Sequence, residues 1–247
     1  MIILKSPAEI DIIAANGAIL KECFAFANDF IKPGRTRKEL DEKIEKIILG
    51  HGAKPAFKGF QGFPAATCVS VNEEVVHGIP GDQRIEDGDI VGLDIGVWKD
   101  GYYADAARTV PAGEISNEAV RLLEVTKEAL DSGIQQARPG KRLTDISHAV
   151  EQKAKEAGYS VVRSLVGHGI GQQMHEEPQV PNFGPPSQGP ELREGLVLAI
   201  EPMVNMGGSD VFTLEDGWTI ITADRSMSAH FEDTVAITEE GPRILTR

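Results

Sequence analysis

The chain has little cysteine and no long hydrophobic run. Only Cys23 and Cys68 occur among 247 residues, far apart and outside any CxxC pair. There is therefore no disulfide framework, which favours a reducing compartment. Lys5, Glu9 and Asp11 interrupt the apolar stretch at the N-terminus, which argues against a signal peptide. Since no run approaches the roughly 18 apolar residues that a membrane span needs, we expect a cytoplasmic protein with no membrane association.

Positive charge is also scarce. The 25 Lys and Arg residues oppose 38 Asp and Glu residues, and the formal net charge is -13. Such an acidic chain disfavours a nucleic-acid groove, so we expect no direct nucleic-acid function. The hydrophobic content of 41% is that of an ordinary globular protein, and the length suffices for one large domain or two small ones.

Two pairs of predicted helices repeat at an interval of 106 residues. In the first pair, a helix capped by Ser6 ends near Pro33-Gly34, and a second helix starts at a Thr36/Glu39 capping box. The second helix is expected to stop at Gly50 or Gly52. Without a gap, Pro33-Gly34 matches Pro139-Gly140, and Gly52 matches Gly158. This register indicates a structural duplication rather than the general likeness of amphipathic helices.

Strand-like segments follow each helix pair. They are residues Thr67–Val75, Ile90–Val97 and Tyr102–Thr109 in the first half, and Val161–Val166, Leu196–Ile200, Trp218–Thr222 and Phe231–Thr238 in the second. We therefore predict an α+β fold in which helices cover a curved, mainly antiparallel sheet. The whole chain, 1–247, is expected to form a single domain of two similar halves, roughly 6–110 and 116–240.

The segment LDIGVWKDGYYADAART, residues 93–109, predicts a β-hairpin around Asp100-Gly101. With a two-residue turn, Asp94 would face Ala107, and Asp105 would be its diagonal neighbour. A four-residue loop would instead set the two aspartates directly opposite each other. Either register places both carboxylates on one face of the sheet. Like charges side by side in a half-buried sheet are destabilising unless another group neutralises them.

Three further groups lie in similar contexts. Glu201 directly follows one predicted strand, Glu232 precedes another, and His168 lies between two glycines. Alone, each has an ordinary explanation as a solvated or core residue, and the G-x-G-x-G spacing around His168 does not fit a phosphate loop. Together with the aspartates they make four carboxylates and one imidazole, which suit a pair of divalent ions such as Co, Mn, Fe or Zn. Ions about 3.5–4 Å apart under bridging carboxylates would acidify a shared water into a nucleophile.

Five other histidines complete the sequence. His77 in VVHGIP and His175 in MHEEP fall near the proposed ligands. His51 and His148 lie in the covering helices and are expected at the surface. His230 is expected to alternate away from the ligand-bearing face that contains Glu232 if this stretch is a regular strand.

Taken together, these motifs resemble type I, bacterial-type methionine aminopeptidase of the pita-bread metallopeptidase family. The markers extend over nearly the whole chain: VNEEVVHGIP, the Asp94–Asp105 hairpin, GHGIGQQMHEEPQV, LAIEPM, DGWTIIT and HFEDTVAIT. The resemblance implies an aminopeptidase that removes the initiator methionine from nascent proteins and peptides when the second residue is small. It also implies the pita-bread fold with its pseudo-twofold repeat.

The resemblance implies a ligand set for two divalent ions. Asp94 would bind one metal, and His168 and Glu201 the other. Asp105 and Glu232 would bridge both.

The resemblance also implies catalytic and substrate-binding roles. Glu201 would be the general base, His175 would stabilise the tetrahedral oxyanion, and His77 would contact the backbone beyond the scissile bond. Family members often carry tyrosines where Phe60 and Phe63 stand and an aromatic residue where Met174 stands, which leaves the detailed selectivity of the pocket open. The methionine pocket would be lined by Phe57, Phe60, Phe63, Cys68, Met174 and Trp218, with His77 and His175 beside it.

Three other readings compete with this one. A Xaa-Pro peptidase has a similar metal set on the same fold, but usually carries a large N-terminal domain, whereas here the catalytic fold begins at Ser6. A non-catalytic binding protein on this fold would typically lack metal ligands. A structural calcium site disagrees with His168 among the ligands. Nascent-chain substrates imply transient proximity to the ribosome, and we expect a monomer.

Overall fold

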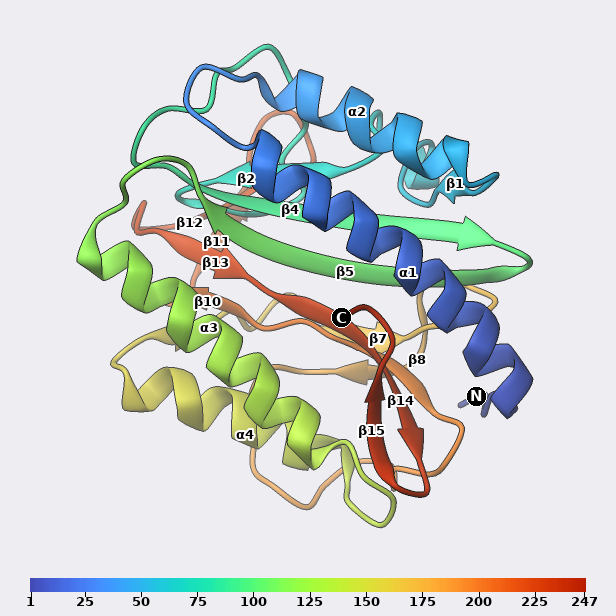
Figure 1. Cartoon of the computed structure of the whole chain (residues 1–247). Helices are drawn as coiled ribbons and strands as arrows, with labels where there is room; N and C mark the ends of the chain where they lie inside the picture. Colours follow the sequence, from blue (N-terminus) through green and yellow to red (C-terminus); the bar gives the residue numbers. More distant parts are fainter.

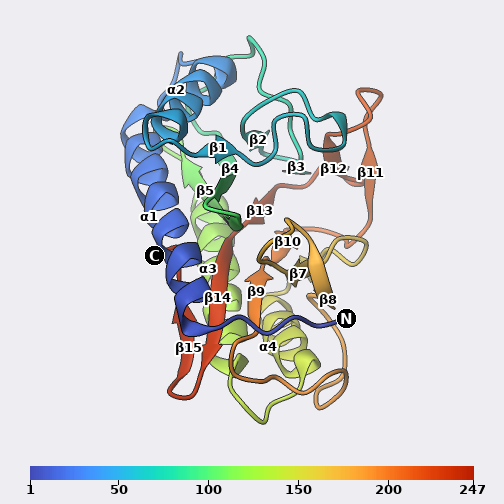
Figure 2. The same cartoon turned by 90° about the vertical axis from the view of Figure 1, so that its right-hand side faces the viewer.

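Four helices pack on the sheets of the molecule (Figure 1). The computed structural model describes residues 1–247. Helix α1 packs against β4 and β5, while α3 packs against α4 and against strands β9, β10 and β13. Figure 2 shows α1 and α3 along one side of the molecule and strands β7, β8, β11 and β12 on the other. The helices are α1 (Pro7–Phe30), α2 (Arg37–Gly50), α3 (Asn117–Gln136) and α4 (Leu143–Glu156), with a short 3₁₀ helix η1 (Phe60–Gly62) between β1 and β2.

Fifteen strands form three sheets, and every pairing is antiparallel. The largest sheet has the order β1-β4-β5-β14-β9-β7-β8, with β2 also pairing β4 and β15 pairing β14. The smaller sheets have the orders β13-β10-β6 and β11-β12-β3. The strands are β1 (Lys54–Pro55), β2 (Cys68–Val71), β3 (Glu74–Val76), β4 (Ile90–Lys99), β5 (Tyr102–Pro111), β6 (Ser160–Val161), β7 (Gly167–Gly169), β8 (Glu176–Val180), β9 (Val197–Ile200), β10 (Met203–Asn205), β11 (Val211–Thr213), β12 (Ile220–Thr222), β13 (Ser228–His230), β14 (Glu232–Thr238) and β15 (Gly241–Ile244).

The two helix pairs are related as the repeat in the sequence suggests. Helices α2 and α4 both have 14 residues and begin 106 positions apart. The glycines that follow α1 and α3, Gly34 and Gly140, both have positive φ, at 90° and 81°. Each pair covers its own hydrophobic core, one centred on α1, α2 and β4 and the other on α3, α4 and β9. The predicted α+β class, with two related halves and a mainly antiparallel sheet, is confirmed.

The hairpin between β4 and β5 has the shorter of the two predicted loops. Asp94 pairs with Ala107, and Gly96 pairs with Asp105. The turn residues Asp100 and Gly101 have φ values of 54° and 85°. Positive φ at both central positions is the type I′ geometry that Asp-Gly favours, because its twist matches that of the strands. The turn chemistry therefore sets the register that places both aspartates on one face.

Two strand predictions were wrong in extent. The segment Thr67–Val75 is divided into β2 and β3 by a turn in which Asn72 has a φ of 56°. Only Val161 of the predicted strand Val161–Val166 is extended in a sheet, as part of β6. In both cases strand-favouring residues such as valine lie on both sides of a turn or loop, so composition alone could not mark the break.

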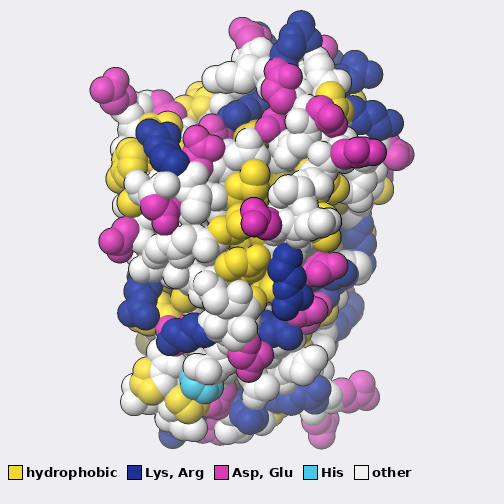
Figure 3. All heavy atoms as spheres, turned by 90° about the vertical axis from the view of Figure 1, so that its left-hand side faces the viewer, with side chains coloured by type: hydrophobic (Ala, Val, Ile, Leu, Met, Phe, Trp, Pro, Cys, Tyr) yellow, Lys and Arg dark blue, Asp and Glu magenta, His cyan; other side chains and the backbone are white.

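None of the helices is long and apolar enough to span a lipid bilayer. On the face shown in Figure 3, acidic and basic side chains are interspersed, and hydrophobic side chains form a narrow central strip. The exposed large hydrophobic residues are Met1, Ile3, Leu4, Leu49, Val120 and Phe212. Apart from the three at the N-terminus, they are far apart in sequence.

Candidate metal centre and substrate pocket

Adjacent strands of the large sheet bring five candidate ligands together. In the order β4-β5-β14-β9-β7, the strands carry Asp94, Asp105 and Glu232, then Glu201 just beyond β9, and His168. Ala107 pairs with Asp94 on one side and with Glu232 on the other. Since paired residues share a face and side chains alternate along a strand, Asp105 lies on the same face as these two carboxylates.

Three carboxylate oxygens in this cluster are buried without a hydrogen-bond partner. They are Asp94 Oδ1, Asp105 Oδ1 and Glu232 Oε1. Asp105 and Glu232 are only 4% and 2% exposed. Ligand atoms of Asp105, His168 and Glu232 all lie within 4.8 Å of one another. Buried carboxylates without donors are costly unless a cation compensates them, so this donor set fits divalent metal ions.

The electrostatics of the cluster point in the same direction. Burial raises the pKa of Asp94 to about 7. Burial, together with the neighbouring charges of Glu232 and Asp94, raises the pKa of Asp105 well above its usual range. Burial and nearby carboxylates likewise raise the pKa values of Glu201 and Glu232. Without cations the cluster therefore tends to retain protons, and bound cations would favour the ionised carboxylates.

His168 presents one ring nitrogen to the cluster. Its Nδ1 lies 2.9 Å from the carbonyl oxygen of Gly169, which can only accept, so Nδ1 carries the proton. Its Nε2, 3.6 Å from Glu201 Oε1, is left with a free lone pair. Burial, helped by the adjacent His175, lowers the pKa of His168 to about 4. A neutral imidazole fixed through its other nitrogen is the usual state of a metal-ligating histidine.

The glycines on both sides of His168 allow the strands to approach closely. A Cβ on Gly167 would lie 2.4 Å from the carbonyl oxygen of Ala199 on β9. A Cβ on Gly169 would lie 2.4 Å from the carbonyl oxygen of Glu177 on β8. Neither position can take a side chain without moving the strand that holds His168.

A cavity of about 150 Å³ adjoins the carboxylates. Every residue that the sequence predicts for metal binding, catalysis or the methionine pocket lines this cavity. Gln61, for which the sequence offered no signal, also lines it. The lining residues are Phe57, Phe60, Gln61, Phe63, Cys68, His77, Asp94, Asp105, His168, Met174, His175, Glu201, Trp218 and Glu232.

Aromatic side chains shape the apolar part of this cavity. The rings of Phe63 and Trp218 meet edge to face, with their centroids 5.1 Å apart. Their neighbours Phe57 and Met174 pack against Gly96 on β4, where a Cβ would lie 2.7 Å from Phe57 Cε1 and 3.1 Å from Met174 Cε. Because Gly96 has no side chain, Phe57 and Met174 can pack directly on the β4 backbone and form one wall of the pocket.

Two histidines stand where the pocket meets the carboxylates. The His175 ring lies edge to face with both His168 and Phe60, at centroid distances of 4.4 and 5.4 Å. His77 has a φ of 59°, an uncommon conformation for a residue with a side chain. Burial lowers the pKa of both His77 and His175, so each is neutral near pH 7.

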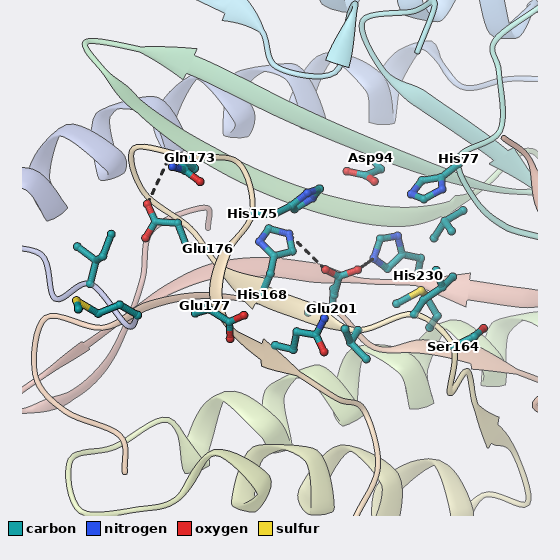
Figure 4. A pocket seen from close by; sticks show the side chains of 18 residues that line it. His77, Asp94, Ser164, His168, Gln173, His175, Glu176, Glu177, Glu201 and His230 are labelled. Atoms are coloured by element: carbon teal, nitrogen blue, oxygen red, sulfur yellow. Dashed lines mark hydrogen bonds and ion pairs between the residues drawn. The ribbon is translucent and has the colours of Figure 1, made fainter. Parts of the chain in front are cut away.

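A wider groove of about 730 Å³ leads away from the carboxylates. Figure 4 shows its lining side chains, with the Glu201 carboxylate between the rings of His168 and His230. The residues that the groove shares with the smaller cavity are His77, Asp94, His168, His175 and Glu201. The site thus has a small, largely aromatic chamber on one side of the carboxylates and an open groove on the other.

The expectation for His230 was wrong. Its ring lines the groove, with Nε2 3.9 Å from Glu201 Oε2. The stretch is not one regular strand, because His230 ends β13 and Glu232 begins β14, and these strands belong to different sheets. Even in a regular strand, residues two apart would share a face. His51 is exposed, as expected, and pairs with Glu22 at 2.9 Å. His148 is half-buried, with Nδ1 3.2 Å from the carbonyl oxygen of Gly184.

Comparisons with known proteins agree over the full chain. The model of metallopeptidase family M24 matches residues 11–239. A methionine aminopeptidase of Clostridium perfringens (strain 13 / Type A) is 53% identical over 246 residues, covering 100% of this chain and 99% of that protein. A crystal structure of a methionine aminopeptidase from Thermotoga maritima is 44% identical with a TM-score of 0.98, and each chain covers 100% of the other. A prolidase structure from Pyrococcus horikoshii is 28% identical with a TM-score of 0.81, covering 99% of this chain and 63% of that one.

Proposed function

The chain belongs to metallopeptidase family M24, with its pita-bread fold, and from this premise we propose that it removes the N-terminal methionine of polypeptides. Two observations support the proposal. The relative named above as a methionine aminopeptidase is 53% identical over the full chain, whereas the prolidase structure is 28% identical. The site combines a carboxylate-rich cluster with a small apolar chamber beside it.

We propose that the cluster holds two divalent ions, and the strand order supports the division of ligands. Asp94 lies on one flank of the cluster, while Glu201 and His168 lie on the other. Asp105 and Glu232 come from the two strands in between, β5 and β14, so these two carboxylates would be shared by both ions. Four carboxylates balance the charge of two dications. Such oxygen and nitrogen ligands suit Co, Mn, Fe or Zn and do not select strongly among them.

When bound, the ions supply a water that is nucleophilic at neutral pH and polarise the carbonyl of the first peptide bond. The chain's own residues would do the rest. Glu201 would accept the proton of the attacking water, since its carboxylate lies at the boundary between chamber and groove. His175 would donate a hydrogen bond to the oxyanion that develops on the carbonyl oxygen. His77, in its strained conformation at the groove, would contact the substrate backbone beyond the scissile bond.

The chamber would select the first side chain. An unbranched thioether fits a narrow aromatic cavity, and contacts between sulfur and aromatic rings add ~0.3–1.5 kcal/mol each. Phe63, Met174 and Cys68 are all buried and present no charge to the side chain. The free α-amino group would bind at the carboxylate cluster, which restricts cleavage to the first residue. We further propose that only a small second side chain leaves room beside the cluster.

We propose a cytoplasmic monomer that acts near the ribosome on nascent chains. The absence of a disulfide supports the reducing compartment, because both cysteines are buried and free. The exposed large hydrophobic residues beyond the N-terminus, Leu49, Val120 and Phe212, are far apart in sequence, which supports a monomer.

The test is the release of free residues from defined peptides by Mn²⁺- or Co²⁺-loaded protein. We expect methionine to be released from Met-Ala-Ser, and little from Met-Lys-Ser. Xaa-Pro peptides distinguish the related prolidase activity. Cleavage of Xaa-Pro peptides in preference to Met-Ala-Ser would overturn the proposal, and comparable kcat/KM for Met-Ala-Ser and Met-Lys-Ser would remove the selectivity for small second residues.

A second measurement separates chemistry from metal binding. His175→Ala should retain bound metal and lose activity, because it removes a donor aimed at charge that develops only in the transition state. A loss of ~10²–10³ in kcat is typical for such a donor. Parallel loss of metal and rate would assign His175 to metal binding instead.

A further inference from the structure

We propose that His230 is a positioning residue for Glu201: its buried Nε2, which has no hydrogen-bond partner and lies 3.9 Å from Glu201 Oε2, would donate a hydrogen bond to this carboxylate after a small side-chain shift and hold it in one orientation. The inference rests on the proposed function, in which Glu201 is both ligand and base. His230 itself has no role in the ligand set derived above.

The first observation is an unpartnered nitrogen aimed at the site. His230 is 4% exposed, and its Nε2 has no hydrogen-bond partner. The nearest acidic group is Glu201, whose Oε2 is 3.9 Å from this nitrogen. The other oxygen of the same carboxylate, Oε1, is 3.6 Å from His168 Nε2. Glu201 therefore lies between two imidazoles, one for each of its oxygens (Figure 4).

The second observation is a rigid support for His230. The hydroxyl of Thr109 on β5 accepts from the His230 amide N–H and donates to the His230 carbonyl oxygen, both at 2.9 Å. On its other side His230 pairs with Met203 of β10. The Thr109 hydroxyl thus makes the two hydrogen bonds that a neighbouring strand would otherwise make with the backbone of His230. The His230 ring is therefore carried by a fixed backbone segment. A hydrogen-bond donor on a fixed backbone can set the orientation of the carboxylate that accepts from it.

The two imidazole nitrogens that face Glu201, His168 Nε2 and His230 Nε2, have different hydrogen-bonding roles. His168 keeps its proton on Nδ1 and turns a lone pair toward the cluster, so it can only accept or ligate there. A proton on His230 Nε2 would supply the donor that the second oxygen of Glu201 lacks. With Oε1 turned toward His168 and Oε2 held by His230, the carboxylate would no longer rotate freely between metal binding and proton transfer.

The experiment compares His230→Gln, which keeps an amide donor at similar reach, with His230→Leu, which fills similar space without a donor. Wild type and both variants are stripped of metal and titrated calorimetrically with Mn²⁺. Their kcat and KM for Met-Ala-Ser are then measured after loading. The matched control is His51→Gln, which changes an exposed histidine remote from the site.

We expect His230→Leu to lose ~10–100-fold in Mn²⁺ affinity or kcat, the usual scale for a residue that orients a ligand. KM should change less than kcat, because the His230 nitrogen faces the Glu201 carboxylate. His230→Gln should recover most of the loss, and His51→Gln should equal wild type. Wild-type behaviour of His230→Leu would overturn the proposal. Equal defects in His230→Gln and His230→Leu would also overturn it, since they would make the imidazole itself a ligand.

Failure of the proposed function is recognised separately. If wild-type protein binds Mn²⁺ but releases no methionine, the peptidase assignment fails. The calorimetric comparison of the His230 variants still tests the positioning of Glu201. A melting temperature for each metal-free variant identifies loss of folding, in which case only the Gln variant and wild type are compared by their Mn²⁺ affinity and their kcat.

Discussion

Asp94 and Glu232 lie on opposite sides of one alanine. Ala107 on β5 pairs with Asp94 on β4 and with Glu232 on β14, so a single methyl group separates two carboxylates across three strands. Ala107 is itself 1% exposed. The space in which metal ions are proposed to bind is therefore created as much by this small residue as by the acidic ones.

Ala107→Val should impair metal binding. The two added methyl groups would project between Asp94 and Glu232, where the ions are proposed to bind. Overpacking of a buried position costs ~1–3 kcal/mol of stability as well. We expect a lower Mn²⁺ affinity by calorimetry and loss of peptidase activity. The control is Ala106→Val on the opposite face, where Ala106 is fully buried in the hydrophobic core. Equal Mn²⁺ affinity in both variants would contradict the role of Ala107.

The metal-free protein should lose stability as pH rises. Burial raises the pKa of Asp94 from 3.8 to about 7, so the folded state holds a proton that the unfolded state has released. Stability that depends on this proton is complete below about pH 4 and is lost as pH rises through about 7. Asp105→Asn removes one like charge from the cluster, so its metal-free melting temperature should fall less between pH 5 and pH 8. A wild-type melting temperature that does not fall more than that of the variant would disprove this.

The parts of the fold that were predictable depend on local chemistry. The α1 cap at Ser6, the Thr36 capping box and the Asp100-Gly101 turn each act within a few residues, and each lies where the sequence placed it. The three-residue strands β7, β10 and β13 were not predicted as such. Such strands have no periodicity of their own and exist because distant partners pair with them.

In the candidate site, too, some residues could be predicted from local sequence and others could not. Carboxylates in apolar strands are conspicuous in sequence because their burial needs compensation. Gln61 was missed because it reaches the cavity through a positive φ of 49° in η1, which nothing in FQG predicts. His230 was predictable, because a residue two positions from Glu232 would share its face even in a regular strand.

Gly96→Ala should narrow the methionine chamber without disturbing the metal centre. The added Cβ would lie 2.7 Å from Phe57 Cε1, 2.9 Å from Ala56 Cβ and 3.1 Å from Met174 Cε, so these side chains must shift and the wall of the chamber changes shape. We expect a higher KM for Met-Ala-Ser with unchanged Mn²⁺ affinity. Gly92→Ala is the control on the same strand, since its Cβ would approach nothing closer than 3.4 Å. An unchanged KM in Gly96→Ala would show that Phe57 and Met174 do not bound the substrate side chain.

The N-terminal segment supports the loop that carries Met174 and His175. Lys5 Nζ lies 2.5 Å from Glu176 Oε2, and the two side chains are 2% and 5% exposed. Glu176 Oε1 in turn accepts from the amide of Gln173 at 3.2 Å. The ion pair therefore ties residues 173–176 to the start of α1.

Lys5→Met should leave the Glu176 carboxylate buried without its cation. Breaking a buried pair in this way costs about 3–5 kcal/mol, whereas replacing both partners by apolar residues is often neutral. We therefore expect Lys5→Met to lower the free energy of unfolding by about that amount, and Lys5→Met combined with Glu176→Met to recover most of it. The double variant should still show a reduced kcat with unchanged Mn²⁺ affinity, because Gln173 loses its acceptor and the loop is less firmly held at His175. The exposed ion pair between Arg243 and Asp11, whose charged atoms are 2.9 Å apart, provides the comparison. Arg243→Ala should lower the free energy of unfolding by no more than ~1 kcal/mol. Urea denaturation and steady-state kinetics measure these effects, and equal stability losses for Lys5→Met and Arg243→Ala would refute the importance of the buried pair.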